Sequence, residues 1–101
     1  LRGLYLNTLM AWLAEQVQAG AWREGAELAR HILDREAWLE EVWRALMTCL
    51  ARLGRRSEAL QAYQACARAL YDQLDAAPSA ETQALYESLR EGPSVSRPPE
   101  P

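Results

Sequence analysis

The sequence is poor in residues that build crosslinks or reactive sites, since it has two cysteines, one histidine, no lysine and no phenylalanine among 101 residues. The cysteines are not in CxxC spacing, nothing resembles a signal peptide, and no apolar run reaches the about 18 residues of a membrane helix. These absences argue against a secreted disulfide scaffold and against a membrane protein. We expect a cytoplasmic location and no membrane contact.

Positive charge is also scarce, because 11 arginines face 14 acidic residues and the net charge is -3. No global positive field would therefore draw this chain onto nucleic acid or an anionic membrane. If the chain belongs to a DNA-binding protein, we expect the DNA-reading domain outside these residues. A first residue of Leu1 instead of methionine also favours a piece of a longer protein.

Proline is rare before the last residues, and the chain ahead of them has the patterning of amphipathic helices. Apolar side chains recur at helical spacing, and Gly20 and Gly54 are placed as left-handed helix caps. The pattern predicts an all-α domain with five helices, over 4–19, 22–35, 38–53, 55–74 and 78–90. The proline-rich tail over 91–101 is expected to be disordered.

The predicted core follows the apolar stripes of these helices. The strongest stripe is in the third helix and consists of Leu39, Val42, Trp43, Leu46, Met47, Leu50 and Leu53. In the first helix, Tyr5 and Trp12 widen the stripe, and Trp12 is expected to be buried. Leu74, at the end of the fourth helix, is expected to pack against the fifth.

The sequence repeats weakly at an offset of 34 residues, the period of tetratricopeptide repeats. The offset places Gly20 on Gly54, so that a glycine ends the first helix of each hairpin. It also places Gly25 on Ala59, small residues at the expected close approach of two helices. This predicts a right-handed, tetratricopeptide-like stack of two antiparallel helical hairpins with the fifth helix as a C-terminal cap.

Residues 40–89 carry an ordered set of motifs. They are Glu40 before Arg44-Ala45-Leu46-Met47, Gly54-Arg55-Arg56-Ser57-Glu58-Ala59-Leu60 with Tyr63, Leu70 with Leu74, and Pro78-Ser79-Ala80-Glu81-Thr82 with Leu85-Tyr86. In these motifs the chain resembles the bacterial transcriptional activator domain, the tetratricopeptide-like domain that follows a winged helix-turn-helix in antibiotic-regulatory-type activators. Two departures lie in loops: Asp75 stands where the family usually has glycine, and 34–37 lacks the common proline.

The resemblance implies a domain over 1–90 that regulates transcription through protein contacts, without catalysis or a cofactor, while another domain reads DNA. The implied partners are a second copy of the chain in a homodimer, neighbouring domains of the parent protein, and the transcription machinery. The dimer contact is expected on the outer face of the last helix or on the first hairpin. The alternative is a generic tetratricopeptide scaffold or peptide-binding module of a signalling protein unrelated to transcription.

The first helices of the two hairpins are expected to line the concave side of the stack. The candidate partner-binding residues on that side are Asn7, Met10, Ala14, Gln18, Glu41, Arg44, Thr48 and Arg52. A second candidate is the basic patch of Arg52, Arg55 and Arg56. Its arginines either bind phosphate or an acidic partner, or they stabilise the carboxyl end of the third helix and form ion pairs with nearby acidic residues.

The remaining candidates lack companion residues for chemistry. His31 has no ligand set at metal-binding spacing, so we expect it on the solvated surface. Cys49 and Cys66 are expected to be buried small apolar residues, because a redox pair would need Cα atoms within about 7 Å. Trp38 precedes the third helix and is either an exposed contact residue or packed over the hairpin junction. No catalytic set is present, and we expect no enzyme.

Overall fold

The computed structural model describes residues 2–91, with side chains from Tyr5 onward, and this part of the chain is entirely helical apart from its turns. The helices are α1 (Arg2–Gln18), α2 (Trp22–Arg35), α3 (Glu40–Arg52), α4 (Arg56–Leu74) and α5 (Ala80–Glu91). The predicted five helices are confirmed. The tail expected to be disordered lies outside the described residues, except for Glu91, which is still part of α5.

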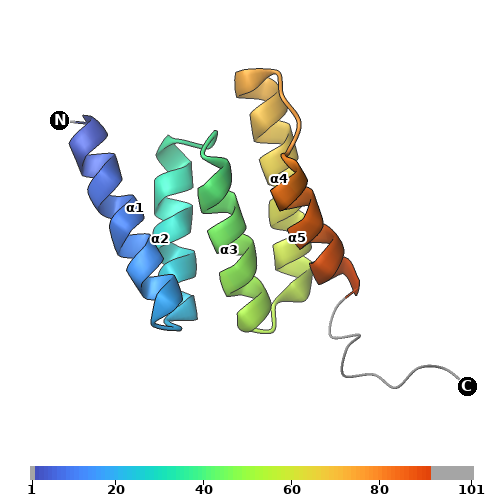
Figure 1. Ribbon diagram of the computed structural model, residues 1–101, viewed down its shortest axis with the longest axis horizontal. Helices are drawn as coiled ribbons and strands as arrows, with labels where there is room; N and C mark the ends of the chain where they lie inside the picture. Colours follow the sequence, from blue (N-terminus) through green and yellow to red (C-terminus); the bar gives the residue numbers. More distant parts are fainter. Residues whose placement is uncertain (1, 92–101) are drawn as a thin grey trace, which may run out of the picture.

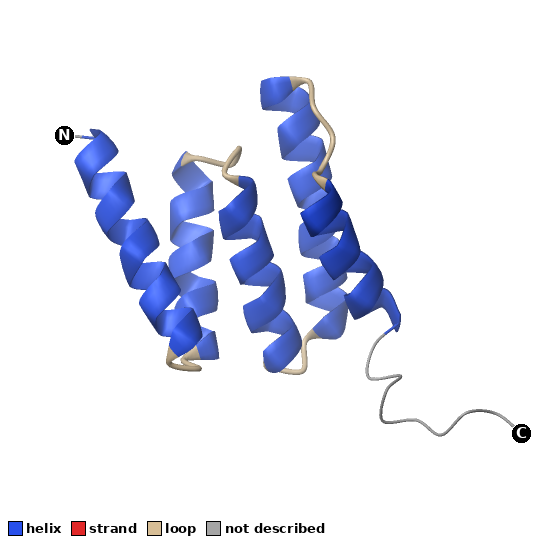
Figure 2. Ribbon diagram, viewed as in Figure 1, coloured by secondary structure: helices blue, strands red, loops and turns tan. Residues whose placement is uncertain are grey.

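The helices form two layers. In Figures 1 and 2, α1, α3 and α5 lie in front, and α2 and α4 lie behind them. Consecutive helices pack against each other, and α3 also contacts α1 and α5. The architecture is therefore the expected tetratricopeptide-like stack, with the hairpins α1–α2 and α3–α4 followed by α5 as a cap.

The central position of α3 explains why its apolar stripe is the strongest in the sequence. Val42, Leu46, Met47 and Leu50 are each at most 2% exposed, because neighbours surround this helix on several sides. The cap is joined to the second hairpin by aromatic packing. The rings of Tyr63 on α4 and Tyr86 on α5 stack with their centroids 4.0 Å apart.

The turns that close the two hairpins have the same geometry. Gly20 and Gly54 adopt φ angles of 75° and 79°, a left-handed conformation that glycine reaches without steric cost. The residue after each glycine donates its N–H to the carbonyl oxygen four positions before the glycine, at 2.9 Å from Ala21 and 2.8 Å from Arg55. The sequence repeat is therefore also a repeat of backbone hydrogen bonds.

The end of α4 has the same kind of cap without a glycine. Asp75 has φ 53° and ψ 43°, the left-handed conformation that the family's usual glycine would supply. The N–H of Ala76 then donates to the Leu70 carbonyl at 3.2 Å. Aspartate is one of the few residues that tolerate this conformation, so the departure from the family pattern leaves the turn intact.

The loop between the hairpins is held by two tryptophans instead of a proline. The indole N–H of Trp43 donates to the Ala37 carbonyl at 2.7 Å. The indole N–H of Trp38 donates to the carboxylate of Glu36 at 2.8 Å, while Trp38 itself is 40% exposed. Trp38 is thus partly exposed, while its indole N–H is hydrogen-bonded within the loop.

Three core assignments from the sequence are wrong, and the three residues lie at the ends of the architecture. Tyr5 is 55% exposed. Trp12 and Leu74 are each 52% exposed. Trp12 is on the side of α1 that faces away from α3, where no described element covers it. Leu74 lies in the last turn of α4, which extends beyond the neighbouring helices (Figure 1). A stripe in one helix cannot show how far the neighbouring helix reaches.

Candidate protein-binding surfaces

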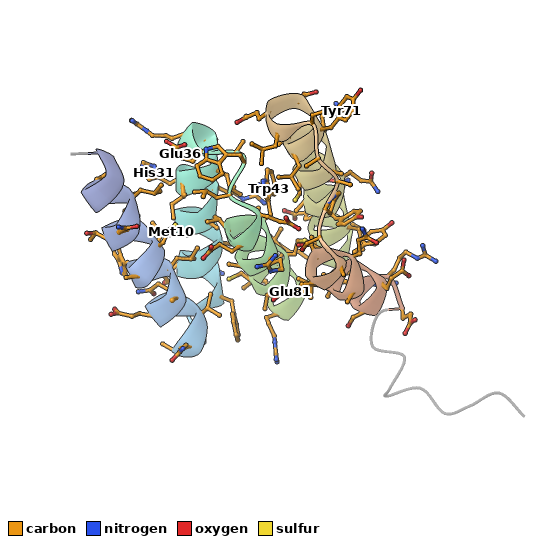
Figure 3. The ribbon with its side chains drawn as sticks, turned by 45° about the horizontal axis from the view of Figure 1, so that its top comes forward. Met10, His31, Glu36, Trp43, Tyr71 and Glu81 are labelled. Atoms are coloured by element: carbon orange, nitrogen blue, oxygen red, sulfur yellow. The ribbon has the colours of Figure 1, made fainter. Side chains whose placement is uncertain are left out.

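A groove runs between α1 and α3 on the layer that also contains α5. It has a volume of about 240 Å³. Its lining residues are Met10, Leu13, Ala14, Val17, Gln18, Glu41, Val42 and Ala45. The sequence-predicted residues Met10, Ala14, Gln18 and Glu41 are therefore brought together, and we call this surface the α1–α3 groove. Met10, labelled in Figure 3, projects from α1.

The other candidates for the concave side lie outside the lining of this groove. Asn7 is exposed on α1, and Thr48 is half-buried on α3. Arg44 interacts with α5, and the guanidinium of Arg52 lies over the Trp22 ring, 5.4 Å from its centroid. The groove is consequently a mixed polar and apolar surface without an arginine in its lining.

Arg44 belongs to a polar cluster that fastens the start of α5 to α3. Its guanidinium donates to the Thr82 hydroxyl at 2.9 Å and lies 3.6 Å from the carboxylate of Glu81, which is labelled in Figure 3. The Thr82 hydroxyl in turn donates to Glu40, and the Ser79 N–H donates to the same carboxylate oxygen at 2.7 Å. We call Glu40, Arg44, Ser79, Glu81 and Thr82 the α3–α5 clasp.

The electrostatics of the clasp favour an ionised Glu40. Partial burial alone would raise the pKa of this carboxyl, but the hydrogen bonds from Thr82 and Ser79 and the positive charge of Arg44 lower the pKa below its ordinary value. Thr82 is fully buried, so its hydroxyl is shielded from solvent in the folded domain. The motif residues Glu40, Arg44, Ser79, Glu81 and Thr82 are thereby explained as structural contacts between α3 and the start of α5.

The basic patch is divided among different structural contacts. Arg56 donates from Nε to the Leu89 carbonyl at 2.7 Å and from Nη2 to the Arg90 carbonyl, so it binds the carboxyl end of α5. Arg52 lies over Trp22 as described above. Arg55 is exposed, and no side-chain partner is found for it within residues 5–91. The three arginines are therefore engaged differently: Arg56 with α5, Arg52 with Trp22, and Arg55 with neither.

A further surface, which the sequence reasoning did not single out, runs along the outer side of the α1–α2 hairpin. One hollow of about 440 Å³ is lined by Tyr5, Leu6, Leu9, His31, Ile32, Arg35 and Glu36. A second hollow of about 410 Å³ is lined by Trp12, Gln16, Glu24, Glu27 and Leu28. We call the two hollows together the outer edge. Figure 3 labels His31 and Glu36 near the end of α2, beside the first hollow.

The offset of 34 residues contains the signal that would have located the outer edge. It aligns Tyr5 with Leu39 and Trp12 with Leu46. Leu39 and Leu46 are 8% and 2% exposed in the second hairpin, which has the first hairpin packed against it. Tyr5 and Trp12 are 55% and 52% exposed. The outer edge is thus the part of the repeat surface that a preceding hairpin would bury.

The thiols and the histidine form no reactive centre among the described residues. Cys49 and Cys66 are fully buried free thiols, and burial raises the pKa of Cys49 and that of Cys66, the latter to about 12. His31 is exposed on the outer edge. Within residues 5–91, no group of three or more His, Cys, Asp or Glu side chains is arranged to hold a metal ion.

Comparison with known protein families agrees with the motifs and the helix stack. No helix of the described part is long and apolar enough to cross a membrane. No curated protein and no solved structure matches the chain. The family model described as "Bacterial transcriptional activator domain" matches residues 1–90, which include α1 to α4 and all of α5 except its last residue, Glu91. The chain therefore belongs to the bacterial transcriptional activator domain family.

Proposed function

We propose that this domain is a non-catalytic protein-contact module of a cytoplasmic transcription regulator, and that it brings two copies of that regulator together. The family match supports the regulatory role. The net charge of -3 supports leaving DNA recognition to another domain. In this proposal 1–90 form the module and 91–101 form a linker.

The observation that carries the proposal is the difference between α1 and α5, the first and last described helices of the stack. Outward positions of α5 are polar or small: Gln83, Ala84, Glu87 and Ser88 are exposed there. At the other end, α1 exposes Tyr5 and Trp12. The terminal helix of a stack needs a polar outer face when it stands alone in water. The α1 end therefore has the character of an interface, which favours the first hairpin over α5 as the contact.

The α1–α3 groove is a second contact surface in this proposal. Its mixed lining, with Met10 beside Gln18 and Glu41, suits a neighbouring domain of the regulator better than a long apolar peptide. Among the arginines of the basic patch, Arg55 has the freedom to reach an acidic partner. A groove residue such as Glu41 would then tune domain docking without affecting self-association.

Sedimentation of the chain over a range of concentrations tests self-association. We expect the sedimentation coefficient to rise from the monomer value to the dimer value between about 1 μM and 1 mM, the range of modest protein affinities. A chain that remains monomeric throughout this range would refute the self-association part of the proposal.

A further inference from the structure

We propose that two copies of this domain pair antiparallel through their outer edges, about a two-fold axis that passes between the two hollows. This inference rests on the self-association proposed above and adds the surface, the orientation and the residues that decide it. The occupant of the outer edge is then the outer edge of a second copy.

The outer edge of a second copy is the surface of this chain that best covers the outer edge. A head-to-tail arrangement would place α5 of one copy on α1 of the next, but the outward positions of α5 carry Gln83 and Glu87. Such a contact would bury polar groups against Tyr5 and Trp12, and it would leave an open end on every further copy. A two-fold arrangement instead joins apolar surface to apolar surface and closes with two copies.

Charge is distributed unevenly along the outer edge. The hollow that contains Trp12 is bordered by Glu24 and Glu27. The hollow that contains Tyr5 is bordered by His31 and Arg35.

The acidic residue at the Tyr5 end, Glu36, already has a hydrogen-bond partner. Glu36 also lines that hollow, but it is buried and its carboxylate accepts the hydrogen bond from Trp38. One end of the outer edge is therefore acidic on its exposed surface, and the other carries the exposed guanidinium of Arg35. Only an antiparallel arrangement places the acidic end of each copy against the basic end of the other.

The geometry of α2 allows the ion pair between Glu24 of one copy and Arg35 of the other to form twice in one dimer. Glu24 and Arg35 lie on the same face of α2, about 16 Å apart at 1.5 Å per residue. A two-fold axis midway between them brings Glu24 against Arg35 of the second copy and repeats the contact in reverse. Gly25 lies beside Gln16 and Val17, so α1 runs opposite α2 with Trp12 close to this midpoint. The two indoles then meet at the centre of the contact, surrounded by the charge pairs.

The experiment uses charge reversal, because opposite ends must recognise each other in this arrangement. The acidic-end variant is Glu24→Arg with Glu27→Arg, and the basic-end variant is Arg35→Glu. Each variant alone places like charges against each other. We expect its dimer dissociation constant to rise at least tenfold in low salt, as measured by sedimentation equilibrium. All three positions are exposed, and none makes a hydrogen bond or ion pair within the described residues. Glu24 lies in the first turn of α2 and Arg35 in its last turn, so circular dichroism first checks that each variant keeps its helix content.

An equimolar mixture of the two variants gives the decisive reading. In the mixed pair every reversed side chain meets an opposite charge, so we expect heterodimer formation at wild-type affinity, detected by giving one variant a mass tag. Trp12→Ser should weaken the wild-type dimer at least tenfold. The matched control Tyr71→Ser removes another exposed aromatic, at the free end of α4 (Figure 3), and should leave the affinity unchanged.

The outcomes separate this inference from the function on which it rests. If the wild-type chain dimerises but the mixture fails to recover the affinity, the antiparallel outer-edge contact is wrong and self-association occurs elsewhere. If Tyr71→Ser weakens the dimer as much as Trp12→Ser, the outer edge is likewise wrong. If the wild-type chain is monomeric at every concentration, the self-association itself is refuted.

Discussion

Replacing Thr82 with valine tests whether the α3–α5 clasp holds the cap in place. The side chain is fully buried, and its hydroxyl both accepts from Arg44 and donates to Glu40. Valine keeps the shape of threonine and removes only this hydrogen-bonding group. The Glu40 carboxylate then loses the hydrogen bond from this hydroxyl, while α5 stays in contact through Tyr86.

The expected cost follows from the charge of the acceptor and from its exposure. A hydrogen bond to an ionised group contributes about 1.5–3 kcal/mol. The Glu40 side chain is 22% exposed, so water replaces part of the lost contact and the lower part of this range applies. We expect Thr82→Val to reduce the free energy of unfolding by about 1.5–2 kcal/mol. At about 4–8 °C per kcal/mol for a domain of this size, the melting temperature falls by about 6–16 °C.

The pH dependence identifies Glu40 as the source of this cost. Because the folded state lowers the pKa of Glu40, its contribution to stability is present above the unfolded pKa and is lost as pH falls through the folded pKa. The stability difference between wild type and Thr82→Val should therefore narrow as pH is lowered from about 7 to about 3.

Urea denaturation followed by circular dichroism measures this difference at each pH, and hydrogen exchange in α5 reports local release of the cap. Thr48→Val is the matched control, since Thr48 is half-buried on the same helix α3 and makes no side-chain hydrogen bond within the described residues. A cost of Thr82→Val below about 0.5 kcal/mol, or one that does not change with pH, would refute the role assigned to the clasp.

Three further substitutions or treatments test the packing of the hairpins. A Cβ on Gly25 would lie 2.8 Å from the Cys49 sulfur. Gly25→Ala should therefore lower the free energy of unfolding by about 1 kcal/mol, although alanine has the better helix propensity. In a double-mutant cycle, Cys49→Ala should remove most of that cost. Asp75→Gly should raise the free energy of unfolding by about 0.5–1 kcal/mol, because the left-handed φ of 53° is strained for a side chain; an unchanged urea midpoint would contradict this. Burial raises the pKa of Cys49 and Cys66, so an aromatic disulfide reagent at pH 8 should label these thiols only as fast as the domain unfolds. Rapid labelling in the absence of urea would show that the core is open.

The repeat and the helix ends are properties that the sequence determines locally. A left-handed glycine cap depends on a few adjacent residues, so Gly20 and Gly54 predict both hairpin turns without knowledge of distant contacts. The strong stripe of α3 likewise predicts a buried helix. The family motifs over 40–89 can also be recognised in the sequence. The contacts that these residues make cannot be predicted from it. Glu40 and Thr82 become partners only when α5 folds back onto α3.

The candidate surfaces were decided by the tertiary structure. The sequence grouped Arg44 with the partner-binding residues, whereas packing directs this side chain to Glu81 and Thr82. The sequence also placed Trp12 in the core, because an apolar residue on a helix looks the same whether its neighbour is present or absent. Burial is a property of all the surrounding helices, and among the described residues no further hairpin packs against the outer side of α1. The amino-acid pattern thus determined the helices, their turns and their repeat, while only the assembled stack decided which apolar and charged side chains remain at its outer edge.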